Sequence, residues 1–342
     1  MNKFIPFFLL LTLTLFAAGC SRSTSTSMSV TVEQHLAWIP QEVNSVAYFD
    51  VQSLRQSELG KSLEKDFDNK ISRWRDDEDY KEFLDKTGFD VDKDLHNVLM
   101  GFDANDRDTS QRFAVIATGN FDEQKIIEAI KTAHDSMEFH HDKSELASET
   151  YNGKTIYVIK EDGEKACYFA DAHTMVAGSK DWIQAIIDGK SADKSAQKNA
   201  AITGLLGKLR YKDQCWFVAN TATMMEKVAA ELGESGDFQG TRAVKAVQNI
   251  VFSAKVGSKA DLYGEALCDS DDNSQLLTEA MKGALATAKL AVSDDREAVD
   301  MLNRVDVDQA GKAVKMSASL DKAFFDKMRE RVEKGGPAVA LF

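Results

Sequence analysis

The chain has 342 residues, of which 42 are Lys or Arg and 55 are Asp or Glu, so its formal net charge is −13. A chain this acidic, without a basic stripe, lacks the electrostatic footprint of a nucleic-acid-binding protein, and anionic lipid headgroups repel it. Three prolines and 43% hydrophobic residues argue against a disordered chain, and the length is enough for about two domains.

Residues 1–19 have the order of a secretory signal peptide: Lys3, an apolar run from Phe4 to Phe16, and the small residues 17–19. Cys20 follows directly. This arrangement resembles the lipobox of bacterial lipoproteins, in which the cysteine thiol is acylated and the cysteine becomes the mature N-terminus. The match departs at Ala17, where the family usually has Leu. Ordinary signal cleavage and an uncleaved membrane helix are the alternatives, but the apolar run is shorter than the about 20 residues that a span needs.

The lipobox resemblance implies a lipoprotein of the bacterial cell envelope, held on the membrane by acyl chains such as palmitate on Cys20. Ser21 follows the cysteine where an Asp would favour retention, so in a cell with two membranes the resemblance implies the periplasmic side of the outer membrane. Residues 20–30 are rich in Ser and Thr and predict a flexible tether between the anchor and the folded part. Because anionic headgroups repel the acidic folded part, we expect the lipid on Cys20 to be the protein's only contact with the membrane.

One unit recurs after the tether: a short apolar strand, a polar turn and an amphipathic helix. In the first unit Leu59, Leu63 and Phe67 lie on one helix face, and in a later one Gly178 forms the turn and Ser179 the N-cap. The predicted strands are Val46–Val51, Phe113–Thr118, Thr174–Ala177, Cys215–Ala219 and Ala313–Leu320.

Hairpins and capped helices fill the intervals between these units. Asn152-Gly153 is a typical turn pair, and Ile250–Val256 with Leu262–Cys268 reads as a second hairpin. Residues 88–90 are expected to end one helix and cap the next, which would carry Leu95 inward. Adjacent hairpins favour antiparallel strands.

The predicted fold class is therefore α+β, with two related subdomains of antiparallel sheet and helices packed on one face. The first subdomain spans residues 31–197 and the second spans residues 198–342, with the junction placed in the polar, Ala-rich stretch Lys190–Ala201. The recurrence of the strand–turn–helix unit in both halves suggests an internal repeat.

Three cysteines follow Cys20, namely Cys167, Cys215 and Cys268. Cys167 and Cys215 occupy similar apolar strands, so a disulfide between them is feasible in an oxidising envelope. The alternative is that the thiols are unpaired and buried as small apolar side chains.

The best metal candidates are His134, His140, His141 and Asp142, because imidazole and carboxylate groups suit zinc. Their spacing matches no established metal motif, and a solvated polar loop is the alternative. The sequence contains no nucleophile elbow, P-loop, zinc-protease motif or Cys-x-x-Cys pair. We therefore predict no cofactor and assign no catalytic residue.

Several short segments, taken in chain order, resemble those of uncharacterised bacterial envelope proteins akin to the DUF3352-type families. They are Ile39-Pro40, Ser45–Val51, Thr87–Leu95, Thr118–Asp122, Tyr151–Tyr157 and Val176–Ser179. The resemblance covers residues 37–190 well and the second half loosely. The resemblance implies an exported α+β protein with an internal repeat. It implies no activity and no functional residues.

These observations together favour a membrane-anchored, non-enzymatic module that binds an envelope protein or a small ligand. An envelope hydrolase with a spatially assembled site and a carrier of an apolar ligand are the alternatives. We expect a binding site in an exposed apolar face or in a groove between the two halves.

Overall fold

The computed structural model describes residues 28–67, 78–103, 112–136, 146–159, 164–189, 194–212, 214–222, 224–225 and 241–333. The signal peptide, Cys20 and most of the predicted tether therefore lie outside the described residues.

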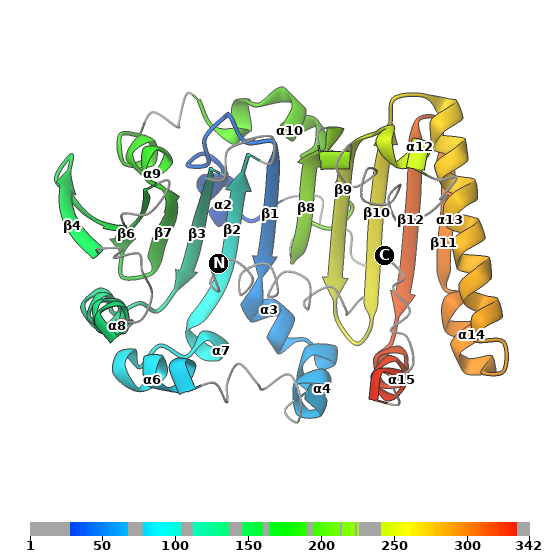
Figure 1. Ribbon diagram of the computed structural model, residues 1–342, viewed down its shortest axis with the longest axis horizontal. Coiled ribbons are helices and arrows are strands. Elements are labelled where there is room, and N and C mark those ends of the chain that lie inside the picture. Colours follow the sequence, from blue (N-terminus) through cyan, green and yellow to red (C-terminus); the bar gives the residue numbers. More distant parts are fainter. Residues whose placement is uncertain are drawn as a thin grey trace.

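Within the described residues, 12 strands form a single sheet (Figure 1). They are β1 (Ser45–Asp50), β2 (Leu95–Phe102), β3 (Phe113–Gly119), β4 (Leu146–Tyr151), β5 (Lys154–Ile159), β6 (Lys165–Asp171), β7 (Thr174–Ser179), β8 (Cys215–Asn220), β9 (Val247–Val256), β10 (Ala260–Cys268), β11 (Val305–Ala310) and β12 (Ala313–Leu320).

Helices connect these strands and pack against the sheet. They are α2 (Val30–Leu36), α3 (Val51–Gln56), α4 (Glu58–Phe67), α6 (Glu78–Thr87), α7 (Val91–Asp94), α8 (Glu123–Ser136), α9 (Lys180–Ile187), the 3₁₀ helix η2 (Ala196–Lys198), α10 (Ala200–Leu206), α12 (Thr241–Lys245), α13 (Asp271–Ala291), α14 (Arg296–Leu302) and α15 (Lys322–Glu333).

The strand order is β11-β12-β10-β9-β8-β1-β2-β3-β7-β6-β5-β4, and every neighbouring pair is antiparallel. This confirms the α+β class and the antiparallel sheet. A three-strand meander runs outward on each side of the centre, β1-β2-β3 on one side and β8-β9-β10 on the other. The internal repeat stays a prediction, and this arrangement is compatible with it.

The two halves are joined by the β1–β8 pair at the centre of the sheet. Tyr48 lies opposite Trp216 in this pair, and their ring centroids are 5.7 Å apart. The predicted junction also packs on the first half, because the Ala196 amide donates to the Ile39 carbonyl at 2.8 Å. The side-chain amide of Asn199 donates to the Gln41 carbonyl at 2.9 Å. The sheet is therefore continuous from one half to the other.

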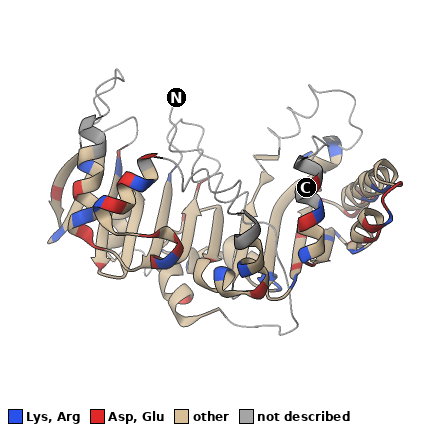
Figure 2. Cartoon of the chain, turned by 90° about the horizontal axis from the view of Figure 1, so that it is seen from below, with Lys and Arg blue, Asp and Glu red and all other residues tan. Residues whose placement is uncertain are grey.

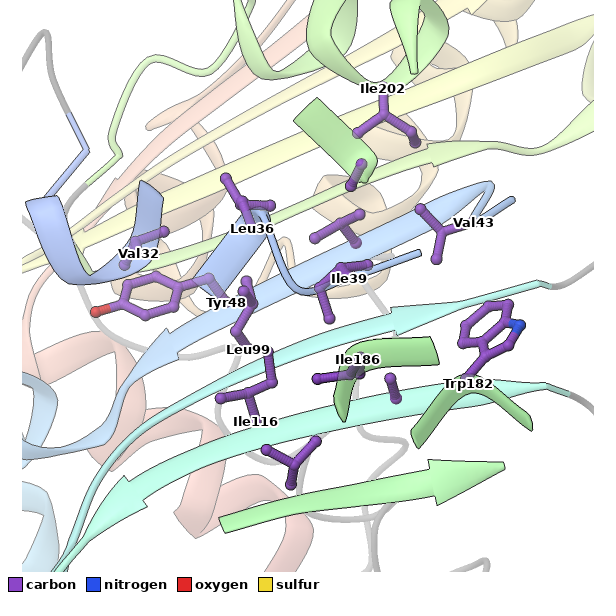
Figure 3. Packing of buried hydrophobic residues seen from close by; sticks show 14 of the residues in the cluster. Val32, Leu36, Ile39, Val43, Tyr48, Leu99, Ile116, Trp182, Ile186 and Ile202 are labelled. Carbon is purple, nitrogen blue, oxygen red and sulfur yellow. The ribbon is translucent and has the colours of Figure 1, made fainter. Parts of the chain in front are cut away.

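One face of the sheet holds the largest group of buried apolar side chains. Val46, Ile116 and Val176 project from β1, β3 and β7 and are each 0% exposed. Helices α2, α9 and α10 cover this face, and Figure 3 shows Leu36, Ile186 and Ile202 of these helices beside the strands.

The opposite face is also apolar, because the central strands carry hydrophobic residues at successive positions. Phe49 of β1 and Leu262 of β10 pack there against α4, α14 and α15. Helices were expected on one face of the sheet, but they lie on both faces. The reason is that the central strands are apolar on both sides, and each apolar face must be shielded from water. Figure 2 shows helices on both sides of the curved sheet, with the charged residues gathered mainly on the helices.

Two local predictions differ from the structure. Strand β7 continues through Gly178 to Ser179, so no separate turn precedes α9. Ser179 is the N-cap residue of α9, as predicted, but its hydroxyl accepts a hydrogen bond from the Phe113 amide at 3.1 Å and makes no side-chain capping bond. The helix expected to follow the cap at Asp90 is short, because α7 ends at Asp94 and Leu95 begins β2. Pairing of β2 with both β1 and β3 outweighs the helical spacing of its leucines.

Candidate functional site

A half-open surface cavity of about 220 Å³ lies at the edge of the core beside the last turn of α9. Four segments that are distant in the sequence form it: the residues just after α2, the start of β5, the second half of β6 and the last turn of α9. The lining residues are Trp38, Lys154, Tyr168, Ala170, Ile186 and Ile187. All but Lys154 present apolar or aromatic surface, so the walls suit the apolar part of a small molecule.

Strand alternation brings Lys154 and Tyr168 to the same face of the sheet, and Ala170 lies at an irregularity in the pairing of β6 with β7. Tyr157 pairs with Cys167, so the next residue of β6, Tyr168, shares a face with Ile156. Lys154 lies two positions before Ile156 and therefore projects to that face as well. The helix above contributes Ile186 and Ile187 from its last turn. The cavity is thus bounded by the sheet on one side and by the last turn of α9 on another.

The rim of the cavity is fixed by the predicted Asn-Gly turn. Asn152 and Gly153 have φ values of 45° and 74°, the left-handed conformation that this turn requires. The Tyr151 hydroxyl donates to Asp188 Oδ2 at 3.1 Å, and the Asn152 side-chain amide donates to Asp188 Oδ1. Because Asp188 is the C-cap of α9, these bonds hold the β4–β5 turn against the end of the helix.

His35 of α2 packs against Trp38, one of the residues that line the cavity. The two ring centroids are 5.1 Å apart, and His35 is 7% exposed. Burial lowers the pKa of His35 from its usual value of 6.5, and the nearby charge of Asp171 opposes that shift. The imidazole is therefore mainly neutral at pH 7 and packs as an aromatic side chain.

Two polar groups in the cavity lining, the Lys154 ammonium and the Tyr168 hydroxyl, have no partner among the described residues. The exposed Lys154 ammonium makes no ion pair there. The Tyr168 hydroxyl makes no hydrogen bond there and is not sealed from solvent. Burial raises the pKa of Tyr168 to about 12, so its hydroxyl keeps its proton and remains a donor at neutral pH. The arrangement can hold an apolar body and an acceptor group together.

The metal candidates are not brought together by the described part of the chain. His134 lies in α8, while His140, His141 and Asp142 lie outside the described residues. Among the described residues no group of three His, Cys, Asp or Glu side chains is placed to hold a metal ion.

The disulfide considered feasible between Cys167 and Cys215 is not formed, and the alternative of unpaired thiols holds. Both thiols are free, as is Cys268. Cys167 lies on β6 and Cys215 on β8, and five steps between neighbouring strands separate these positions, about 24 Å at ~4.8 Å per step. A disulfide requires Cα atoms within about 7 Å. Burial raises the pKa of each of these two thiols to about 12, so both are uncharged packing groups.

The sequence did not single out any cavity-lining residue. We expected a binding site on an exposed apolar face or between the halves, and the cavity lies within the first half instead. The Asn-Gly turn was the nearest available signal, because it places the start of β5 and hence Lys154. The other walls come from segments whose proximity depends on the sheet order, which no local pattern shows.

No family model matches the chain, and no curated protein matches it. Among the solved structures that are similar, the one described as "Structure of crystal form I of TP0453" aligns with 89% of this chain and 97% of its own. The sequence identity is 11% and the TM-score is 0.43. A likeness at this level carries no inference about activity. Among the described residues, no helix has the length and apolar character needed to cross a membrane.

Proposed function

We propose that the chain is a lipid-anchored protein of the bacterial cell envelope whose folded part binds a small ligand in the cavity beside α9. The observation that carries the proposal is the pairing of apolar walls with two unpartnered donors, Lys154 and Tyr168. A few polar groups converging on an apolar pocket are typical of a ligand site. Binding, without chemistry, is the function that this lining supports.

The anchor belongs to the same proposal. Cys20 would carry the acyl chains, and residues 21–27 would let the folded part stand off the bilayer. The end of the predicted tether is folded, because Ser29 is the N-cap of α2 and Met28 packs against the core. In a cell with two membranes, Ser21 favours the periplasmic side of the outer membrane. The resemblance to DUF3352-type envelope proteins agrees with an exported protein. A Cys20→Ala variant should leave the membrane fraction or accumulate as precursor, and undiminished retention would refute acylation as the anchor.

Ligand binding is tested on the protein isolated from its native membranes. Native mass spectrometry should find a non-covalent small molecule on the wild-type chain, in addition to any acyl mass. Ala170→Phe puts a large ring into the cavity and should remove that molecule. Ala284→Phe is the matched control, because Ala284 is exposed on α13 in the other half. A wild-type chain without bound mass, or an Ala170→Phe chain that retains it, would contradict the proposal.

A further inference from the structure

The chemistry of the cavity narrows the class of ligand, and this step rests on the proposed function. A volume of about 220 Å³ corresponds to roughly seven water molecules at ~30 Å³ each. That space suits a body the size of one aromatic ring with a short chain. Trp38 and Tyr168 provide aromatic walls for such a body, and Ile186 and Ile187 provide aliphatic ones.

The charge at the cavity favours an anion. Lys154 is the charged residue of the lining, and it has no ion-pair partner among the described residues. The acid at the rim, Asp188, accepts hydrogen bonds on both oxygens from the β4–β5 turn. A lysine without an ion-pair partner beside apolar walls can contact a carboxylate.

We infer that the cavity binds a small organic carboxylate, with its apolar body against Trp38, Tyr168 and Ile186 and its carboxylate directed to the Lys154 ammonium. The Tyr168 hydroxyl supplies a second donor. The ligand is recognised by a charge-assisted hydrogen bond at the mouth and by ring packing inside. A neutral molecule of the same shape keeps the packing and loses the charge contact.

Three probes of one shape test this inference: 3-phenylpropanoate, 3-phenylpropan-1-ol and 3-phenylpropylamine. Each is titrated calorimetrically into the mature chain in lipid nanodiscs, with empty nanodiscs as the blank. The carboxylate should bind about threefold more tightly than the alcohol, because Lys154 is exposed and solvent screens a charge contact there. The amine should bind most weakly. Equal or tighter binding of the alcohol or the amine would overturn the assignment of an anion.

Variants then locate the charge contact. Lys154→Gln should weaken carboxylate binding about threefold and change alcohol binding less than about 1.5-fold. Tyr168→Phe should weaken carboxylate binding about threefold. Lys259→Gln is the matched control, since Lys259 is an exposed lysine in the β9–β10 turn and its loss changes the net charge equally. Unchanged binding in Lys154→Gln, or an equal loss in Lys259→Gln, would contradict the role of Lys154.

These experiments distinguish an error in the inferred carboxylate specificity from an error in the proposed ligand-binding function. If the alcohol binds and Ala170→Phe abolishes that binding, the cavity is a ligand site and the inferred carboxylate specificity is wrong. If no probe binds, the carboxylate inference is overturned. If native mass spectrometry also finds no bound molecule that Ala170→Phe removes, the proposed ligand-binding function is wrong as well.

Discussion

The Tyr151 hydroxyl lies 3.1 Å from Asp188 Oδ2 and donates a hydrogen bond that joins the β4–β5 turn to the C-terminal end of α9. The two residues are 37 positions apart in the sequence, and the cavity opens beside their contact. This contact and the Asn152–Asp188 hydrogen bond both tie the turn to α9. They matter because β4 is the outermost strand of the sheet and has no neighbour among the described strands on its far side.

Removing that hydroxyl should loosen the rim. Tyr151→Phe keeps the ring in the core and is expected to cost about 1 kcal/mol, the net worth of a typical intramolecular hydrogen bond. Urea unfolding measures the loss, and hydrogen exchange should show faster exchange in β4 and β5 than in β8. Unchanged stability together with unchanged exchange in β4 would show that this bond does not hold the turn.

Gly178 permits the close approach of β3 and β7. A Cβ atom at this position would lie 2.1 Å from the Phe113 carbonyl oxygen and 2.9 Å from Ala114 Cα, both backbone atoms that cannot move aside alone. Gly178→Ala should therefore destabilise the protein by roughly 2 kcal/mol or more in urea unfolding.

Gly204 gives the matched glycine control. It lies in α10, and a Cβ there would meet nothing within 4 Å. Gly204→Ala should be neutral or stabilise the protein by up to about 1 kcal/mol, since alanine favours the helix. Similar losses in both alanine variants would refute the argument from the β3–β7 contact.

Glu265 is a buried carboxylate, 5% exposed, on the second half of the sheet. Lys208 Nζ lies 2.8 Å from its Oε1, and the Tyr263 hydroxyl donates to its Oε2 at 2.9 Å. Lys208→Met would leave the carboxylate without its counter-charge, and we expect a loss of roughly 2 kcal/mol in the free energy of unfolding.

The same substitution at an exposed pair is the control for Lys208. Lys86 pairs with Glu82 across one turn of α6, where both side chains are largely solvated. Lys86→Met should change stability by less than about 0.5 kcal/mol. A Lys208→Met loss as small as this control would mean that Glu265 is sufficiently held by Tyr263 and solvent.

His35 should make stability depend on pH. Burial lowers its pKa in the folded protein, so the unfolded chain binds the proton more readily, and stability rises with pH. Its contribution is present above the unfolded value of 6.5 and is lost as pH falls from there towards the lower folded pKa. Urea unfolding between pH 7.5 and pH 5.5 should show a larger fall for the wild type than for His35→Phe. Parallel pH profiles would exclude His35 as the source.

Much of the fold could be predicted because its signals are local. The Asn152-Gly153 pair marks the β4–β5 turn, and the alternating apolar residues of Ala313–Leu320 coincide with β12. The spacing of Leu59 and Leu63 marks the buried face of α4. Each signal depends only on residues that are close together in the sequence.

The errors concern properties that depend on the sheet order. Cys167 and Cys215 sit in similar apolar strands, yet four other strands separate those strands, so sequence similarity gave no information about distance. Leu95 fits a helical spacing but belongs to β2, where pairing on both sides decides the conformation. The cavity has the same origin, since Trp38 and Lys154 meet only after the sheet and α9 have formed.

The most direct test of the account is methyl NMR of the mature chain labelled at the isoleucine δ1 positions, titrated with 3-phenylpropanoate. The account predicts saturable shifts for Ile186 and Ile187, which line the cavity, and none for Ile250, which packs in the other half. Lys154→Gln should shift the titration midpoint to about threefold higher concentration. Shifts centred on Ile250, or no saturable shift at Ile186 and Ile187, would contradict a carboxylate site beside α9.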